Sequence, residues 1–128
     1  MQQPDTAFSS LAQLARGLQQ KEFSSVELTQ LYLDRIDRFD SRLHAYVNIS
    51  AESALRQARA ADLQRQAGVP LSPLHGLPIA VKDLCEISGE VTTFGSQAWA
   101  TRRSSVTSTA VQRLLDAGMI VLGKTHMV

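Results

Sequence analysis

The residue best suited to chemistry in this sequence is Lys82, which follows the short apolar run 79–81. Pro78 precedes the run, and a proline can begin a central strand although it cannot lie inside one. The run therefore predicts a buried strand that begins at Pro78. Side chains alternate between the two faces of a strand, so Lys82 shares a face with Ala80 and Leu84. We expect Lys82 to be buried among these apolar neighbours.

Burial can turn a lysine into a base. It removes the hydration of the ammonium group and lowers the pKa of the amine. A shift from about 10.4 to about 7 or 8 would cost roughly 4 kcal/mol, while a domain is stable by only about 5 to 15 kcal/mol. A cost of that size favours a function, because a neutral amine can accept a proton. The alternative is a strand-end lysine whose stem covers apolar surface while its ammonium stays in water.

Two residues beside the lysine need separate interpretations. Asp83 carries the opposite charge and would raise the pKa of an amine that it faced, so its predicted place on the other face of the strand is consistent with a neutral lysine. We expect its carboxylate to accept backbone N–H groups from the adjoining loop. Cys85 has neither a paired histidine nor a glycine-rich turn beside it, and we predict an inert apolar side chain.

Apolar spacing predicts three helices before this region. The first spans 8–18, with a serine at position 9 or 10 as its cap. The second begins with a capping box formed by Ser24 and Glu27. A short β-prone piece at 46–49 precedes the third helix, 51–66. A narrow stripe of alanines on that helix predicts close packing on a sheet or on another helix: Ala54, Ala58 and Ala61.

The second half of the chain alternates loops with short elements. Glycine and proline exclude a helix from 68–78, and 89–96 indicates a loop or a short strand. A helix capped by Ser105 or Thr107 then precedes an apolar strand at 119–122. A helix followed by a buried strand is typical of a sheet covered by helices.

Composition is ordinary for a globular protein, with 44% hydrophobic and 20% charged residues and a formal net charge of +1 over 128 residues. This balance predicts no direct binding to nucleic acid and none to a membrane. A single cysteine indicates a reducing compartment, and neither a signal peptide nor a membrane-length apolar segment is seen. We predict a cytoplasmic chain. The three histidines lack metal-ligand spacing, so no metal and no cofactor are expected.

Several glycines, threonines and lysines at fixed spacings resemble the amidase signature family of serine amidohydrolases. They are, in order, Gly76-Leu77-Pro78, Lys82-Asp83, Gly89, Thr92-Thr93, Gly95-Ser96, Ala117-Gly118 and Gly123-Lys124-Thr125. Two positions depart from the family pattern, which commonly has an aspartate near Thr107 and an asparagine where His126 stands.

The resemblance implies an α/β fold, namely the N-terminal part of an α/β/α architecture whose helices pack on a mixed sheet that is incomplete in this chain. It implies an N-terminal helical region, 1–67, followed by the first part of the signature core, 68–128. It also implies a triad of a nucleophilic serine, a second serine held by a cis peptide bond, and a lysine. Lys82 matches that lysine, and six further positions match residues that support the site: Asp83, Gly76, Thr92, Thr93, Gly95 and Ser96.

Both serines of that triad belong to a Gly- and Ser-rich stretch that these 128 residues lack, and Ser96 matches an earlier Gly-Ser position of the family. We therefore expect the N-terminal portion of an amidase that cleaves small-molecule amides, inactive as an isolated chain. One alternative is the A subunit of an amidotransferase acting on misacylated transfer RNA. Another is a non-catalytic interaction fragment, which would self-associate or form a homodimer through open sheet edges.

Overall fold

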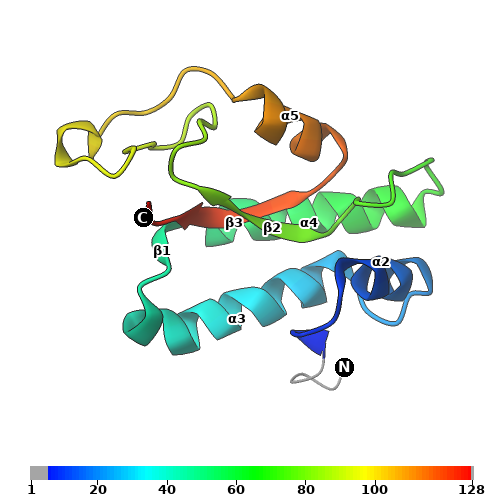
Figure 1. Ribbon diagram of the computed structural model, residues 1–128. Coiled ribbons are helices and arrows are strands. Elements are labelled where there is room, and N and C mark those ends of the chain that lie inside the picture. The colour runs from blue at the N-terminus through cyan, green and yellow to red at the C-terminus, as the bar shows by residue number, and fades with distance from the viewer. Residues whose placement is uncertain (1–5, 128) are drawn as a thin grey trace.

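The computed structural model describes residues 6–127. Residues 1–5, which belong to the segment inspected for a signal peptide, and Val128 lie outside this range. Figure 1 shows the elements in chain order, which are α2 (Leu11–Gln19), α3 (Ser25–Leu43), β1 (Tyr46–Ile49), α4 (Ala51–Gln66), β2 (Pro78–Lys82), η1 (Gln97–Trp99), α5 (Thr109–Asp116) and β3 (Ile120–Thr125).

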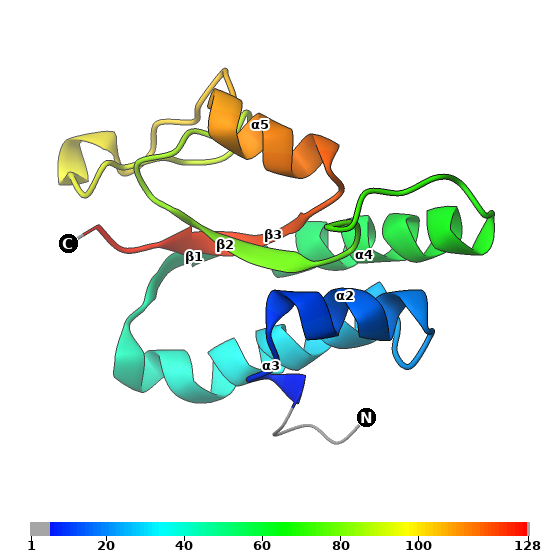
Figure 2. The ribbon, with the colours of Figure 1, turned by 45° about the vertical axis from the view of Figure 1, so that its right-hand side comes forward.

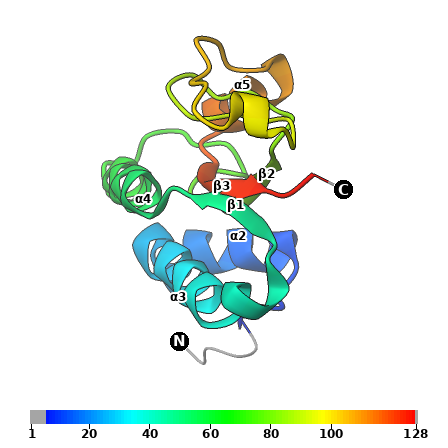
Figure 3. The same cartoon turned by 90° about the vertical axis from the view of Figure 1, so that its left-hand side faces the viewer.

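The three strands form one mixed sheet in the order β1-β3-β2. Its centre is β3, which is antiparallel to β1 and parallel to β2. Helices α2 and α3 lie on one side of the sheet and α5 on the other (Figure 2), and an end-on view shows α4 running alongside β3 (Figure 3). The predicted α/β fold with helices on a mixed sheet is confirmed. The sheet takes strands from both sides of residue 67, since β1 precedes it and the other two follow it.

Local capping signals set the starts of α2 and α3. Ser10 caps α2 and forms a capping box with Gln13, so the helix begins at Leu11 and not at Phe8 as predicted. The predicted capping box of α3 is confirmed: Ser24 Oγ accepts from the Glu27 N–H at 3.0 Å, and the Glu27 carboxylate accepts from the Ser24 N–H at 2.8 Å. Each box pairs two of the N–H groups that a helix start leaves without partners.

The N-terminus of α3 is also tied to α4. The carboxylate of Asp62 on α4 accepts the N–H groups of Ser25 at 2.8 Å and Val26 at 3.1 Å. A carboxylate at this position is favoured by the helix dipole as well as by the hydrogen bonds. The two helices are therefore joined by charge as well as by packing.

The alanine stripe of α4 packs closely, as predicted. Ala54 and Ala58 are fully buried against Ile120 and Leu122 of β3 and Leu33 of α3. Small side chains let the helix axis lie near its neighbours, so the stripe connects α3 to the central strand.

The C-terminal unit corrects two predictions. Ser108 precedes α5 as its cap residue, not Ser105 or Thr107, and its side chain makes no capping hydrogen bond. Thr107 Oγ1 instead accepts the Ser88 N–H at 3.0 Å and so holds the loop before α5. The final strand runs from Ile120 to Thr125 and is longer than the predicted 119–122.

The longer strand depends on a glycine. A Cβ on Gly123 would lie 2.2 Å from the Asn48 carbonyl oxygen of β1. Only glycine lets the two antiparallel strands approach so closely. The chain therefore continues as strand through Lys124. Within the described range, no helix combines the length and the apolar character needed to cross a membrane.

Candidate active site

Lys82 is the last residue of β2 and pairs with Thr125 of the parallel strand β3. The carboxyl ends of parallel strands form the edge at which α/β proteins commonly bind ligands. The expected burial of Lys82 is wrong, because the side chain is only half-buried and its face-mates Ala80 and Leu84 are exposed. No element within residues 6–127 covers this part of the face.

The backbone of Lys82 is held while its amine is free. Its carbonyl accepts the Cys85 N–H at 3.0 Å, which closes a turn directly after the strand. Within the described part of the chain, the amine takes part in neither a hydrogen bond nor an ion pair. A general base needs such an amine, since a lone pair engaged elsewhere cannot accept a proton.

Asp83 anchors the adjoining loop in the way expected of it. Its carboxylate is 1% exposed and accepts the Thr93 N–H at 3.2 Å and the Thr93 hydroxyl. The Asp83 carbonyl also accepts the Phe94 N–H at 3.1 Å, and the Asp83 N–H donates to the Thr125 carbonyl at 3.0 Å. The residue after Lys82 is thus fixed from the loop and from β3.

The buried lysine of this region is Lys124, which the sequence reasoning did not single out for burial. Its side chain is 0% exposed. The ammonium donates to the Cys85 carbonyl at 2.6 Å and to Thr92 Oγ1 at 3.0 Å, and it lies 3.7 Å from the Asp83 carboxylate. Burying a charge costs several kcal/mol unless it is paired and hydrogen-bonded, and these three contacts meet that requirement.

A shift in strand register explains the orientation of Lys124. Ile79 pairs with Val121, but Ala80 pairs with Gly123, so Leu122 is passed over. Such a bulge reverses the alternation of side chains along the bulged strand. Lys124 consequently pairs with Val81 and shares the face that Val81 and Val121 line.

Polar contacts continue from Lys124 towards the surface. Ser104 Oγ lies 3.2 Å from Thr92 Oγ1 and 3.2 Å from the Glu86 carboxylate. Arg102 forms a 2.7 Å ion pair with Glu86. The hydrogen bond from the Arg102 side chain, assisted by the one from Ser104, lowers the pKa of the Glu86 carboxyl.

Arg102 also organises the exposed end of the loop. Its guanidinium lies over the rings of Phe94, 5.9 Å from the centroid, and Trp99, 5.5 Å from the centroid. A guanidinium above an aromatic face is attracted by the ring quadrupole. Contacts thus run from Lys124 in the core to an aromatic pair at the surface.

The remaining residues expected to support the site lie in two places. Gly95 has a positive φ of 75° and donates its N–H to Thr93 Oγ1 at 3.1 Å, and Ser96 Oγ accepts the Ala98 N–H at 3.3 Å. Both belong to the loop that Asp83 anchors. Gly76 lies at the other end of β2, where its N–H donates to the Gly118 carbonyl at 2.8 Å.

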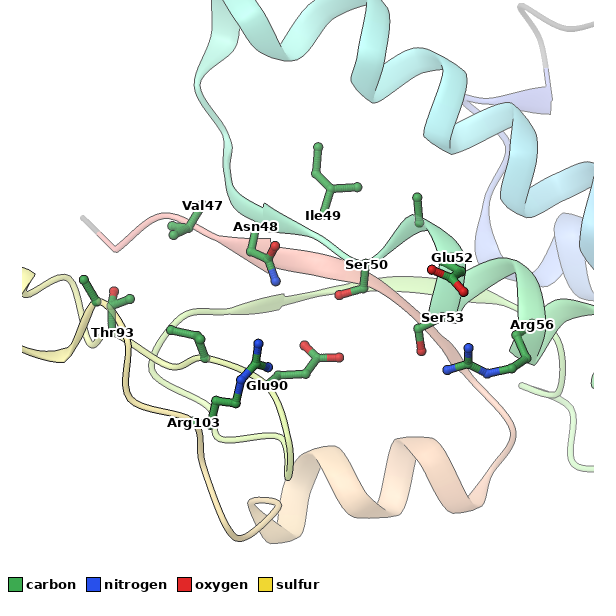
Figure 4. Close-up of a pocket in the computed structure, with 13 residues that line it drawn as sticks. Val47, Asn48, Ile49, Ser50, Glu52, Ser53, Arg56, Glu90, Thr93 and Arg103 are labelled. Carbon is green, nitrogen blue, oxygen red and sulfur yellow. The ribbon is translucent and has the colours of Figure 1, made fainter.

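Two clefts flank the loop. The larger, of about 710 Å³, lies between β1, the start of α4 and the loop. Figure 4 shows Glu90 and Arg103 on its loop side and Ser53 and Arg56 on its α4 side. A second cleft of about 500 Å³ adjoins the end of β3 and is lined by Thr93, Gly95, Ser96 and His126 among others. Lys82 lines neither cleft. No cluster of candidate metal ligands occurs among residues 6–127.

A mixed sheet covered by helices, with a free lysine at the carboxyl end of a parallel strand, defines an α/β protein with a candidate active site. The family model described as Amidase matches residues 27–128. The chain therefore belongs to the amidase family, and the resemblance noted in the sequence is confirmed.

Curated relatives include the A subunit of glutamyl-tRNA(Gln) amidotransferase from Salinispora tropica, 48% identical over 95% of this chain and 25% of the relative. The protein of the same name from Thermobifida fusca is 42% identical over 92% of this chain and 24% of the relative. The chain thus spans about a quarter of the length of the curated relatives that it matches.

Solved structures of amidases share the fold. The peptide amidase from Stenotrophomonas maltophilia superposes with a TM-score of 0.87 and 37% identity, covering 93% of this chain and 25% of that one. An amidase family protein from Bacillus anthracis gives a TM-score of 0.89 and 27% identity, covering 98% of this chain and 25% of that one.

Proposed function

We propose that this chain contributes the lysine of a Ser-cisSer-Lys site that cleaves carbon–nitrogen amide bonds, and that Lys82 is this lysine. The observation that carries the proposal is the state of the Lys82 side chain, whose amine has no partner within residues 6–127 while its backbone is fixed at the end of β2. Family membership supports it, because Lys82 stands at the position that matches the lysine of the family motif.

In the proposed reaction, the Lys82 amine accepts a proton from a bridging serine. That serine in turn takes the proton of the nucleophilic serine, whose oxygen attacks the amide carbonyl. Backbone N–H groups stabilise the resulting oxyanion, at about 3 to 4 kcal/mol for one donor. The proton then returns through the bridging serine to the departing nitrogen as the carbon–nitrogen bond breaks, and water cleaves the resulting acyl-serine. Because the serines would come from sequence other than these 128 residues, the isolated chain would not hydrolyse amides.

A chimera tests the proposal. Residues 6–127 would replace the matching quarter of the Stenotrophomonas maltophilia peptide amidase, and hydrolysis of a peptide amide would be followed. Lys82→Met should reduce the rate by about 10²- to 10⁴-fold, as expected for loss of a general base. Lys21→Met, at an exposed lysine, is the matched control and should leave the rate unchanged. Full activity of an active chimera that lacks Lys82 would refute the assignment.

A second candidate function is the A subunit of an amidotransferase. It is favoured by relatives of that name, which are 42% to 48% identical to this chain. In this case the same lysine would act in amide transfer to glutamyl-tRNA(Gln), and partner subunits would be needed. The open edges of β1 and β2 are where another chain, or a second copy of this one, would add a strand.

Two assays separate the candidates. Conversion of glutamyl-tRNA(Gln) in the presence of an amide donor and partner subunits would support amide transfer, whereas peptide-amide hydrolysis without partners would support a stand-alone amidase. Size-exclusion chromatography of the chain adds a check on association, because a sharp monomer peak argues against pairing through its strand edges.

A further inference from the structure

Buried polar side chains gather beside Lys82. Four of them have exposed fractions of 3% or less and contact one another: Asp83, Thr92, Ser104 and Lys124. We call these four residues the Lys124 cluster. The proposed reaction uses none of them directly.

The partners of the Lys124 ammonium all come from the segment that follows Lys82. Asp83 is the next residue, Cys85 closes the turn, and Thr92 lies in the loop that Asp83 anchors. Lys124 itself belongs to β3, the central strand of the sheet. The Lys124 ammonium therefore connects the segment after Lys82 to β3, the strand that has a neighbour on both sides.

The turn after Lys82 is held from two sides. On the backbone side, the Cys85 N–H donates to the Lys82 carbonyl at 3.0 Å, and the Asp83 N–H donates to the Thr125 carbonyl at 3.0 Å. On the side-chain side, the Lys124 ammonium binds the Cys85 carbonyl at 2.6 Å. Without that ammonium, the Cys85 carbonyl would lose its hydrogen-bond donor and the buried Asp83 carboxylate would lose its neighbouring cation, so the turn would open more readily.

We propose that Lys124 is a positioning residue for Lys82: it fixes the turn after β2, so that the Lys82 amine is presented from one backbone position. This inference rests on the proposed role of Lys82 as the base. Lys124 is not itself a base here, because its ammonium is committed to the Cys85 carbonyl, to Thr92 and to the Asp83 carboxylate.

The chain has three lysines, at positions 21, 82 and 124, which makes the test direct. Reductive methylation of the folded chain, mapped by mass spectrometry, would give the rate at Lys82 relative to the exposed Lys21. Amide hydrogen exchange would be measured in parallel at Asp83, Cys85 and Phe94. Two pairs of variants apply: Lys124→Met with Lys124→Arg, which keeps the charge and the donors, and Thr92→Val with Thr92→Ser, which keeps the hydroxyl.

In Lys124→Met, exchange at the three amides should rise by about tenfold more than exchange in α4, as expected for a local opening. The methylation rate of Lys82 relative to Lys21 should rise with it. Lys124→Arg should restore part of the protection. If Lys124→Met unfolds the chain, Thr92→Val serves instead, since it removes one of the three contacts, and Thr92→Ser should then behave like the native chain.

A uniform increase of exchange over the whole fold, with the Lys82 to Lys21 ratio unchanged, would overturn the proposal and leave Lys124 as a source of stability only. Neither readout involves amide hydrolysis. If the exchange and methylation results contradict the role of Lys124, the chimera still tests the role of Lys82. If the chimera contradicts the role of Lys82, exchange and methylation still measure whether Lys124 holds the turn.

Discussion

Lys82 ends β2 and Lys124 is the penultimate residue of the parallel strand β3, and the two lysines differ in almost every other respect. Lys124 is fully buried, and its ammonium binds a carbonyl, a hydroxyl and a carboxylate. Lys82 is half-buried on the opposite face, and its amine has no partner among residues 6–127. Burial and availability are therefore separate properties. The buried lysine is suited to holding the fold, while the amine of the accessible one is free to contact another group.

The largest loss of stability is expected when the buried lysine, Lys124, is replaced. Lys124→Met leaves the Asp83 carboxylate buried without its cation, which should reduce the free energy of unfolding by about 3 to 5 kcal/mol. Lys82→Met removes no hydrogen bond or ion pair among the described residues and should change this free energy by less than about 0.5 kcal/mol. Urea unfolding followed by circular dichroism would measure both. Equal losses for the two variants would contradict the assignment of roles.

A second substitution sharpens the same point. Asp83→Asn in the Lys124→Met background removes the unpaired charge, so the double variant should be more stable than the sum of the single losses predicts. Residues in one buried network commonly show coupling of about 0.5 to 3 kcal/mol. A coupling near zero in the double-mutant cycle would show that the 3.7 Å approach of the two charges has little energetic weight.

An intermediate effect is expected at a buried threonine. Thr92→Val keeps the side-chain shape but removes the oxygen that accepts from Lys124, so we expect a loss of about 1 to 3 kcal/mol. Thr29→Val is the matched control, because Thr29 is equally buried in α3 and its hydroxyl lacks a partner within residues 6–127. The control should be neutral or stabilising in the same unfolding experiment.

The smallest effect concerns pH and the outer end of the contacts around Lys124. The Arg102 hydrogen bond lowers the pKa of Glu86 below its ordinary value of 4.5. The contribution of the Glu86–Arg102 ion pair to folding stability is thus present above about pH 4.5. It is lost as the pH falls through the lowered pKa of Glu86. Trp99, the only tryptophan, lies under Arg102 and reports the change.

The fluorescence of Trp99 should therefore shift in mild acid in the native chain. Glu86→Gln should abolish that transition, because the amide does not titrate in this range. A transition of the same size in the variant would assign the change to another group.

Local signals predicted much of the fold. The capping box of Ser24 and Glu27, the alanine stripe of α4 and the strand start at Pro78 depend on neighbouring residues, and all are present. The same holds for the contact between Asp83 and its loop, which follows from a carboxylate placed at the end of a strand.

The rest depended on long-range geometry. The period of two along a strand would place Lys124 on the face opposite Val121. Only the bulge at Leu122 brings it to the same face as Val121. The exposure of Lys82 likewise depends on what covers β2, which no local pattern contains. One signal was available: Gly123 interrupts the apolar run at the point where β1 must approach, so the strand could have been extended through Lys124.

The strand order has a consequence for how the protein is made. Within residues 6–127, β1 and β2 bond only to β3, so neither finds this partner until residues 120–125 have left the ribosome. Helices α3 and α4 are adjacent in the chain and can pair earlier, during translation. Both outer strands must wait unpaired through that interval, so the emergence of Gly123 and its neighbours is the event that lets these three strands pair.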